Sequence, residues 1–346
     1  MLVKTRSLFA AICLLAIPVA LSGCKAPTKL EAIWPTASAE RIVAQPPATP
    51  RWPLTGLEAP SVADTQMRVV SVKIENSPAA RPQTGLDRAD VVYEVIAEGG
   101  ITRFHALFHS QMPSVVGPVR SARPPDLYLI SQYHSMIAHV GGPLSVRTLL
   151  RDKTKYNDMD EFFNPASYWR SSKRAAPHNM YLNVGKLRAL GIKNRGYDAT
   201  ATITGFAFNR SAVPGTTTVT LLTVPVSASN KVTWTYHSDT NLYARAINGK
   251  VHKDAVSGKQ LTARNVIVIW ARITPYPGDR HGVVDIKLKG SGRATVLRGG
   301  QKFDGTWNAG TDSPPTFRDK DGNVIKLDPG NTWIQVIGTD QTVRYK

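Results

Sequence analysis

From residue 201 onward, the chain consists of short runs of alternating apolar residues separated by turn residues. A period of two places successive side chains on opposite faces of a strand, and runs this short do not form long helices. Asn248-Gly249 and Asp321-Gly322 lie between such runs, where hairpin turns are expected. Residues 201–346 are therefore predicted to form a β-rich domain, either barrel-like or sandwich-like. The predicted strands are 219–224, 232–236, 242–247, 265–270, 283–288, 294–297 and 333–337.

Residues 66–200 combine short strands with short helices, which predicts a mixed α/β domain. Asn183 is expected to cap a helix that ends at Gly191. The chain as a whole is therefore predicted to be of the α+β class, with the β-rich domain second. The predicted strands of the first domain are 68–75, 90–98, 101–109 and 136–140, and its other predicted helices are 126–130 and 144–151.

The runs before and after Gly99-Gly100 are predicted to form a β-hairpin. If the two glycines are the turn residues, Glu94 lies opposite His105, and Asp90 lies opposite His109, on a polar face. That face is either solvated and stabilised by pairs of opposite charge, or it is the floor of a polar site. The second interpretation makes Glu94 and Arg103 candidate site residues.

Arg120 and Arg123 follow a short apolar run, Val115, Val116 and Val119, which is predicted to be a buried strand. No acidic residue lies between that run and the helix predicted next. Pro124 and Pro125 suit the first turn of this helix. A guanidinium group offers a planar fork for phosphate or carboxylate, and a helix N-terminus adds free N–H groups. The segment thus predicts an anion site containing Arg120, Ser121 and Arg123. The alternative is that both arginines hold neighbouring loops through carbonyl and carboxylate oxygens.

Residues 168–179 are basic, aromatic and without periodicity, which predicts a surface loop. His178 and Asn179 at its end are added to the ligand-binding candidates. The candidate catalytic residues are Glu94, Glu98 and His105. No metal site or cofactor is expected, because His105 and His109 on one strand would be roughly 13 Å apart.

The first residues carry Lys4 and Arg6, then an apolar run that ends in Leu21-Ser-Gly-Cys24. This pattern is typical of a secretory signal over residues 1–23. The last four residues resemble the lipobox of bacterial lipoproteins, which implies lipid attachment to Cys24 at the extracytoplasmic face of the cell membrane. A plain secretory signal is the alternative. Residues 24–65 are rich in proline and alanine and are predicted to form a tether.

The formal net charge is +18. A strongly basic protein tethered to a membrane is expected to interact with acidic lipids or anionic wall polymers. Nucleic acid ranks lower as a partner, because no nucleic-acid-binding motif is present and the predicted location is outside the cytoplasm. General solvation of the surface is the alternative explanation of the charge.

Several longer motifs resemble the YerB-type lipoproteins, a family of uncharacterised function defined by the DUF3048 domains. The resemblance covers nearly all of the chain beyond the tether and implies a mixed N-terminal domain and a β-rich C-terminal domain. It implies no reaction. The motifs that carry it are Ile74-Glu-Asn76, residues 80–86, Ala89-Asp-Val-Val-Tyr-Glu94, Glu98-Gly-Gly-Ile-Thr-Arg103, residues 117–123, Ala176-Pro-His-Asn179, Val232-Thr-Trp-Thr-Tyr236 and residues 330–335.

These observations leave three functional hypotheses. The first is a binding module for an anionic envelope ligand, such as a wall polymer, a phosphorylated glycan or an acidic lipid. The second is an envelope phosphotransferase or hydrolase in which Glu94, Glu98 or Asp90 serves as base or divalent-metal ligand. The third is a scaffold for a protein partner. Trp234, Tyr236, Trp307 and Trp333 are expected in the core or, alternatively, on a sugar-binding surface.

Overall fold

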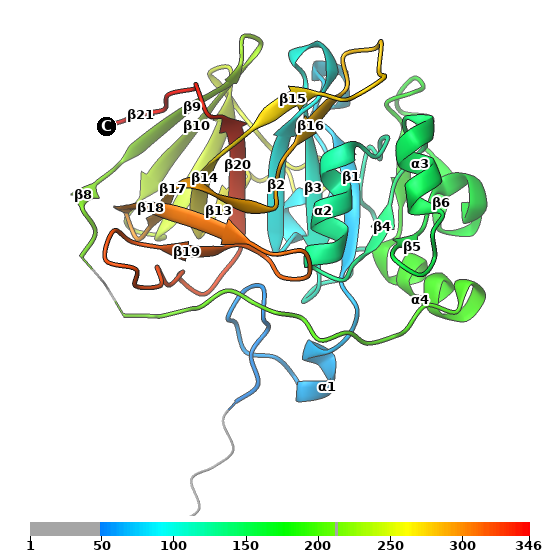
Figure 1. Cartoon of the computed structure of the whole chain (residues 1–346), viewed down its shortest axis with the longest axis horizontal. Coiled ribbons are helices and arrows are strands. Elements are labelled where there is room, and N and C mark those ends of the chain that lie inside the picture. Colours follow the sequence, from blue (N-terminus) through cyan, green and yellow to red (C-terminus); the bar gives the residue numbers. More distant parts are fainter. Residues whose placement is uncertain (1–48, 212–213) are drawn as a thin grey trace, which may run out of the picture. The chain divides into compact units, whose positions relative to one another are not determined.

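Strand β20 (Thr332–Gly338), close to the C-terminus, lies between β14 (Asn265–Ala271) and β2 (Val91–Ile96) in one mixed sheet (Figure 1). The computed structural model describes residues 49–211 and 214–346. Both neighbours run parallel to β20, with Val266 and Val92 each opposite Trp333. The two halves of the chain are thus joined by main-chain hydrogen bonds within a single sheet.

This sheet contains 11 strands. Its parallel pairs are β14 with β20, β20 with β2, β1 with β4, and β4 with β5, and its other pairs are antiparallel. The order is β19 (Thr316–Arg318), β18 (Gln301–Ala309), β17 (Gly290–Arg298), β14, β20, β2, β3 (Thr102–Phe108), β1 (Val70–Glu75), β4 (Met136–Ala138) and β5 (Asn157–Asp158), and β8 (Thr217–Thr218) pairs with β18.

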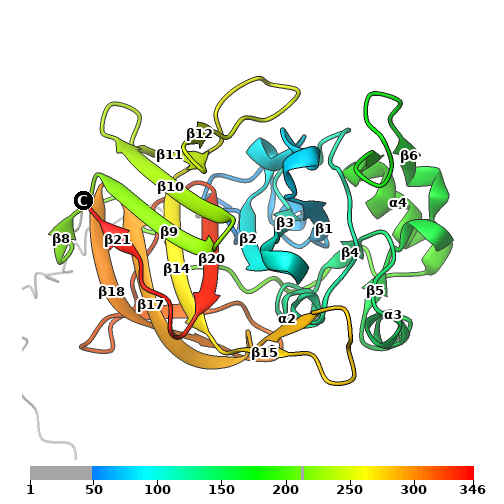
Figure 2. The same cartoon turned by 90° about the horizontal axis from the view of Figure 1, so that it is seen from above.

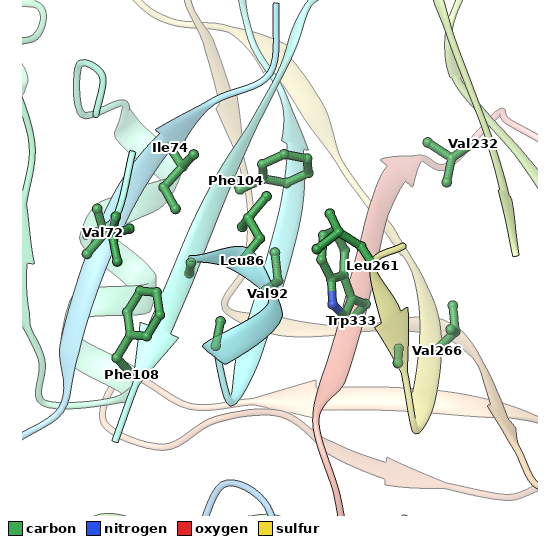
Figure 3. Close-up of a cluster of buried hydrophobic side chains, with 14 of the residues drawn as sticks. Val72, Ile74, Leu86, Val92, Phe104, Phe108, Val232, Leu261, Val266 and Trp333 are labelled. Atoms are coloured by element: carbon green, nitrogen blue, oxygen red, sulfur yellow. The ribbon is translucent and has the colours of Figure 1, made fainter. Parts of the chain in front are cut away.

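A second sheet of six strands packs against the large sheet in the C-terminal half (Figure 2). Phe104 and Trp333 from the large sheet share one buried cluster with Val232 from the second sheet (Figure 3). The second sheet contains β12 (Lys250–Val251), β11 (Leu242–Ile247), β10 (Asn230–His237), β9 (Leu221–Ser227), β21 (Arg344–Tyr345) and β13 (Thr262–Ala263); two small hairpins are β15 (Ile273–Pro275) with β16 (Val284–Ile286), and β6 (Tyr168–Arg170) with β7 (Met180–Leu182).

The helices of the described residues are short, and none is both long and apolar enough to span a membrane. Asn183 caps the longest one, as predicted, by accepting a hydrogen bond from the Lys186 amide at 2.7 Å. The prediction that this helix ends at Gly191 is wrong. The α-helices are α1 (Val62–Thr65), α2 (Pro124–Gln132), α3 (Leu144–Leu150) and α4 (Val184–Arg195), and the 3₁₀ turns are Pro78–Ala80, Leu86–Arg88, Glu98–Gly100, Glu161–Phe163 and Pro165–Ser167.

Gly191 lies inside α4 because it allows close packing on the sheet. A Cβ atom at this position would lie 2.8 Å from the sulfur of Met136. The helix ends instead at Gly196, whose φ of 71° is left-handed.

The predicted α+β class is confirmed: a mixed region with helices precedes an antiparallel β-rich region. The segment 115–119, which was expected to be a strand, forms only isolated bridges, such as Val119 with Ile74. Residues 49–65 pack onto the fold, where Leu54 is fully buried. The signal peptide, Cys24 and the rest of the predicted tether lie outside the described residues.

Candidate functional site

The β2–β3 hairpin pairs one residue away from the predicted register. Tyr93 lies opposite His105, and Glu94 lies opposite Phe104. The connection is a 3₁₀ turn at Glu98–Gly100 instead of a two-residue glycine turn. Because side chains alternate along a strand, this one-residue shift places Glu94 and His105 on opposite faces of the hairpin. The prediction that Glu94 and His105 share a polar face is therefore wrong.

His105 belongs to a buried ionic cluster beneath α2. The carboxylate of Asp126 lies 2.8 Å from Lys73 Nζ and 2.9 Å from His105 Nδ1, and all three side chains are fully buried. Burial lowers the pKa of His105, against the opposing effect of Asp126. Burial alone would raise the pKa of Asp126, but Lys73 and His105 outweigh it and lower that pKa.

Asp126 also occupies the N-terminus of α2. Its side chain accepts a hydrogen bond from the Arg123 amide at 2.6 Å, and its own amide donates to Arg123 O at 2.9 Å. The first two helical positions are Pro124 and Pro125, which have no N–H group. The prediction that this helix end offers free N–H groups to an anion is therefore wrong.

Arg123 and Arg103 share the carboxylate of Glu98. Arg123 Nε donates to one oxygen of Glu98, and Arg103 Nη1 lies 3.2 Å from the other. Arg123 Nη1 also donates to Ala122 O at 2.8 Å. For Arg123, these contacts fit the alternative in which the arginine holds neighbouring loops through carboxylate and carbonyl oxygens. The carboxylate comes from Glu98, which is distant in sequence and was therefore not expected as a partner. These two bonds use two of the five N–H groups of the guanidinium.

Arg120 is held more loosely than Arg123. Its Nε lies 3.4 Å from Glu75 Oε2, and its side chain is 27% exposed. Glu75 also lies 2.9 Å from His178 Nδ1, so His178 joins the same group. Asn179 does not join it, because it accepts from Arg170 Nη1 at 3.0 Å within its own loop.

The arrangement has an excess of positive charge. Three guanidinium groups, those of Arg103, Arg120 and Arg123, face the two carboxylates of Glu75 and Glu98. Burial and the charges of Arg123 and Arg120 lower the pKa of Arg103 to about 10, against the opposing effect of Glu98. An arginine pKa this low indicates that a positive charge is costly there.

Arg123, Ser121 and Glu98 line an open pocket of about 430 Å³. Its far side is formed by Asp279 and His281 at the tip of the β15–β16 hairpin, which extends toward α2 in Figure 2. We call this group the arginine site. It contains Glu75, Glu98, Arg103, Arg120, Ser121, Arg123 and His178.

Glu94 lies on the other face of the sheet, in a buried ion pair between the two halves of the chain. Its Oε2 accepts a hydrogen bond from Arg245 Nη2 at 2.8 Å, and both side chains are fully buried. The Arg245 guanidinium carbon lies 5.3 Å from the ring centre of Trp234 and 4.9 Å from that of Trp333. The prediction that both tryptophans are core residues is confirmed.

Asp90 also points away from the arginine site. Its carboxylate accepts hydrogen bonds from the amides of His109, at 2.5 Å, and Ser110, at 2.9 Å. Of the three candidate acids, only Glu98 is therefore at the arginines. Within residues 49–211 and 214–346, no group of three His, Cys, Asp or Glu side chains could hold a metal ion.

Sequence reasoning did not identify Glu75, Lys73 and Asp126 as members of these clusters. The sequence did contain a signal for Glu75 and Lys73, because both residues alternate with apolar residues along one strand. In the structure, that strand is buried on both faces. Asp126 had no such signal, since an acid in the first turn of a helix is common at the surface.

Comparison with known proteins agrees with this architecture. The chain is 32% identical over 292 residues to the Bacillus subtilis (strain 168) protein described as "Putative lipoprotein YerB", covering 82% of this chain and 85% of that protein. The crystal structure of YerB protein from Bacillus subtilis superposes with a TM-score of 0.77 at 28% identity, covering 86% of this chain and 99% of that one. Residues 54–198 match the N-terminal domain of DUF3048, a protein family of unknown function, and residues 222–334 match its C-terminal domain. The chain therefore belongs to the DUF3048 family.

Proposed function

We propose that this chain is a lipid-anchored extracytoplasmic protein that binds an anionic ligand of the cell envelope at the arginine site. The anchor would be a lipid on Cys24, at the end of the signal-like segment. The description of the Bacillus subtilis relative as a lipoprotein supports this part of the proposal.

The observation that carries the proposal is a pocket lined by Ser121 and Arg123, in a group of three arginines that share only two carboxylate partners, Glu75 and Glu98. Asp279 also lines the pocket, and it forms no ion pair with these arginines in the described residues. Arg120 is the most accessible of the three arginines and the least tightly paired. A phosphate or carboxylate entering the pocket would bind the remaining N–H groups of Arg123 and the hydroxyl of Ser121. Its negative charge would offset the excess positive charge of the site.

The enzymatic alternative has less support from the geometry. Glu94 and Asp90 are engaged elsewhere, and Glu98 is paired with Arg103 and Arg123. Hydrogen bonds and charge from these two arginines outweigh the effect of burial and lower the pKa of Glu98. A lowered pKa makes this carboxylate a weak base.

The proposal is tested by calorimetric titration of the full chain with glucose 1-phosphate, at low and high salt. Arg120→Ala combined with Arg123→Ala should weaken binding at least about tenfold, because charge-assisted hydrogen bonds are lost. Arg120→Ala alone, which leaves Glu98 paired, should weaken it less. Arg151→Ala, an exposed arginine outside the site, is the matched control. An affinity that is the same in all variants would refute the proposal.

A further inference from the structure

A second basic pocket lies at the base of the β15–β16 hairpin, whereas the tip of this hairpin lines the arginine site. The pocket has a volume of about 390 Å³ and is lined by Arg272, Lys287, Lys289 and Arg293. These four side chains belong to exposed residues. Among the residues described, none of those that line this pocket is acidic.

Arg293 is held over a rigid aromatic surface. Its guanidinium carbon lies 3.8 Å from the ring centre of Trp270. Trp270 is only 5% exposed, its Nε1 donates to Gln341 O at 2.7 Å, and its carbonyl oxygen accepts from Trp307 Nε1 at 3.0 Å. Because the indole is fixed, the cation–π contact holds the Arg293 guanidinium in place.

A neighbouring pocket of about 400 Å³ shares Trp270 and Arg293 as lining residues and extends to Lys302 and Tyr345. Lys302 Nζ lies 4.8 Å from the ring centre of Tyr345 and 2.7 Å from Asp304 Oδ2. We call the two pockets together the Arg293 groove. Its cations are Arg272, Lys287, Lys289, Arg293 and Lys302, and its one acid is Asp304.

Two cavities that share one guanidinium group suit a ligand with anionic groups repeated along a chain. The aromatic rings that line the groove are covered by cations or buried, because Arg293 lies over Trp270, Lys302 lies over Tyr345, and Trp307 is only 2% exposed. Single-stranded nucleic acid sites depend on free aromatic stacking surfaces. We therefore propose that the Arg293 groove binds a linear polyol phosphate, a polymer with one phosphodiester in each repeat and no aromatic group.

The test is calorimetric titration of the full chain, in detergent, with a synthetic glycerol-phosphate oligomer at low and high salt. Lys287→Ala with Lys289→Ala and Arg293→Ala should weaken binding about tenfold and reduce its salt dependence, since each neutralised phosphate contributes to the salt slope. The matched control removes the same charge from exposed lysines outside the groove, with Lys153→Ala, Lys173→Ala and Lys259→Ala. The control should bind as the unmodified chain does.

Equal weakening in the triple variant and its control would overturn the proposal, because net charge alone would then explain binding. Failure of the unmodified chain to bind the oligomer would also overturn it. Tighter binding of a DNA oligonucleotide with the same number of phosphates would replace the proposed ligand class with nucleic acid. This test is independent of the test of the arginine site, because glucose 1-phosphate binding and its loss in the Arg120 and Arg123 variants are measured separately.

Discussion

Glu94 and Arg245 form an ion pair at 2.8 Å with both side chains fully buried, although 151 positions separate them in the sequence. The carboxylate also accepts hydrogen bonds from Asn76 Nδ2, at 3.2 Å, and Thr102 Oγ1, at 2.7 Å. Arg245 Nε donates to His252 Nδ1 at 3.0 Å. The pair thus connects β2 of the large sheet with β11 of the second sheet.

Removing only one partner should destabilise the fold strongly, because a buried charge is then left without its counterion. We expect Arg245→Ala to lower the free energy of unfolding by ~3–5 kcal/mol. Arg245→Met combined with Glu94→Gln should cost less than Arg245→Ala, because neither charge remains. Urea denaturation measures both, with exposed Arg280→Ala as control, expected within ~0.5 kcal/mol of the unmodified chain. A cost below ~1 kcal/mol for Arg245→Ala would contradict this role.

Asp90 and His109 should give the fold opposite responses to acid. Burial raises the pKa of Asp90 to about 6, although hydrogen bonds from Ser110 and His109 oppose the shift. Burial lowers the pKa of His109 to about 4. Below the pKa of folded Asp90, the folded state takes up a proton there before the unfolded state does, which stabilises the fold. Below the ordinary histidine pKa, His109 binds a proton in the unfolded state but not in the folded state. This difference destabilises the fold.

The two effects oppose each other between pH 6 and pH 4, so single variants should separate them. Relative to neutral pH, His109→Gln should lose less stability on acidification than the unmodified chain does, by ~2–3 kcal/mol near pH 4. In Asp90→Asn, stability should fall more steeply than in the unmodified chain. Urea denaturation at several pH values measures both slopes. Identical slopes in the two variants would show that neither group titrates as described.

Asp126 is expected to be essential for stability, because it neutralises Lys73 and fills the end of α2. Asp126→Asn should lower the free energy of unfolding by ~3–5 kcal/mol, since buried Lys73 then has no counterion. The Arg123 amide should also exchange its hydrogen faster in this variant, because its acceptor is weaker. Asp321→Asn, in an exposed turn, is the control. Normal stability together with unchanged exchange at Arg123 would contradict this account.

The local patterns of this sequence predicted much of the fold. The predicted strand 68–75 contains β1, in which Val70, Val72 and Ile74 belong to one buried cluster, and the Asn248-Gly249 turn joins β11 and β12. The patterns could not show that β20 lies beside β2, because pairing between distant strands leaves no periodicity in either. They also could not distinguish two hairpin registers that differ by one residue, since both faces of β2 and β3 are buried.

For the candidate site, the sequence identified the arginines but not their partners. Arg120, Ser121 and Arg123 are adjacent in the chain, so their proximity required no knowledge of the fold. Glu98 and Glu75 come from different parts of the chain, and only the sheet brings them to the arginines. Assigning Glu94 to the site failed because the register decides which face a strand residue occupies.

A crystal structure of the full chain with glucose 1-phosphate tests the central claim most directly. The account predicts the phosphate in the pocket of the arginine site, with its oxygens about 3 Å from Arg123 nitrogens and the Ser121 hydroxyl. Arg120 is expected to turn toward it from Glu75. A ligand bound elsewhere, with Arg123 unchanged on Glu98 and the pocket holding only solvent, would contradict the claim.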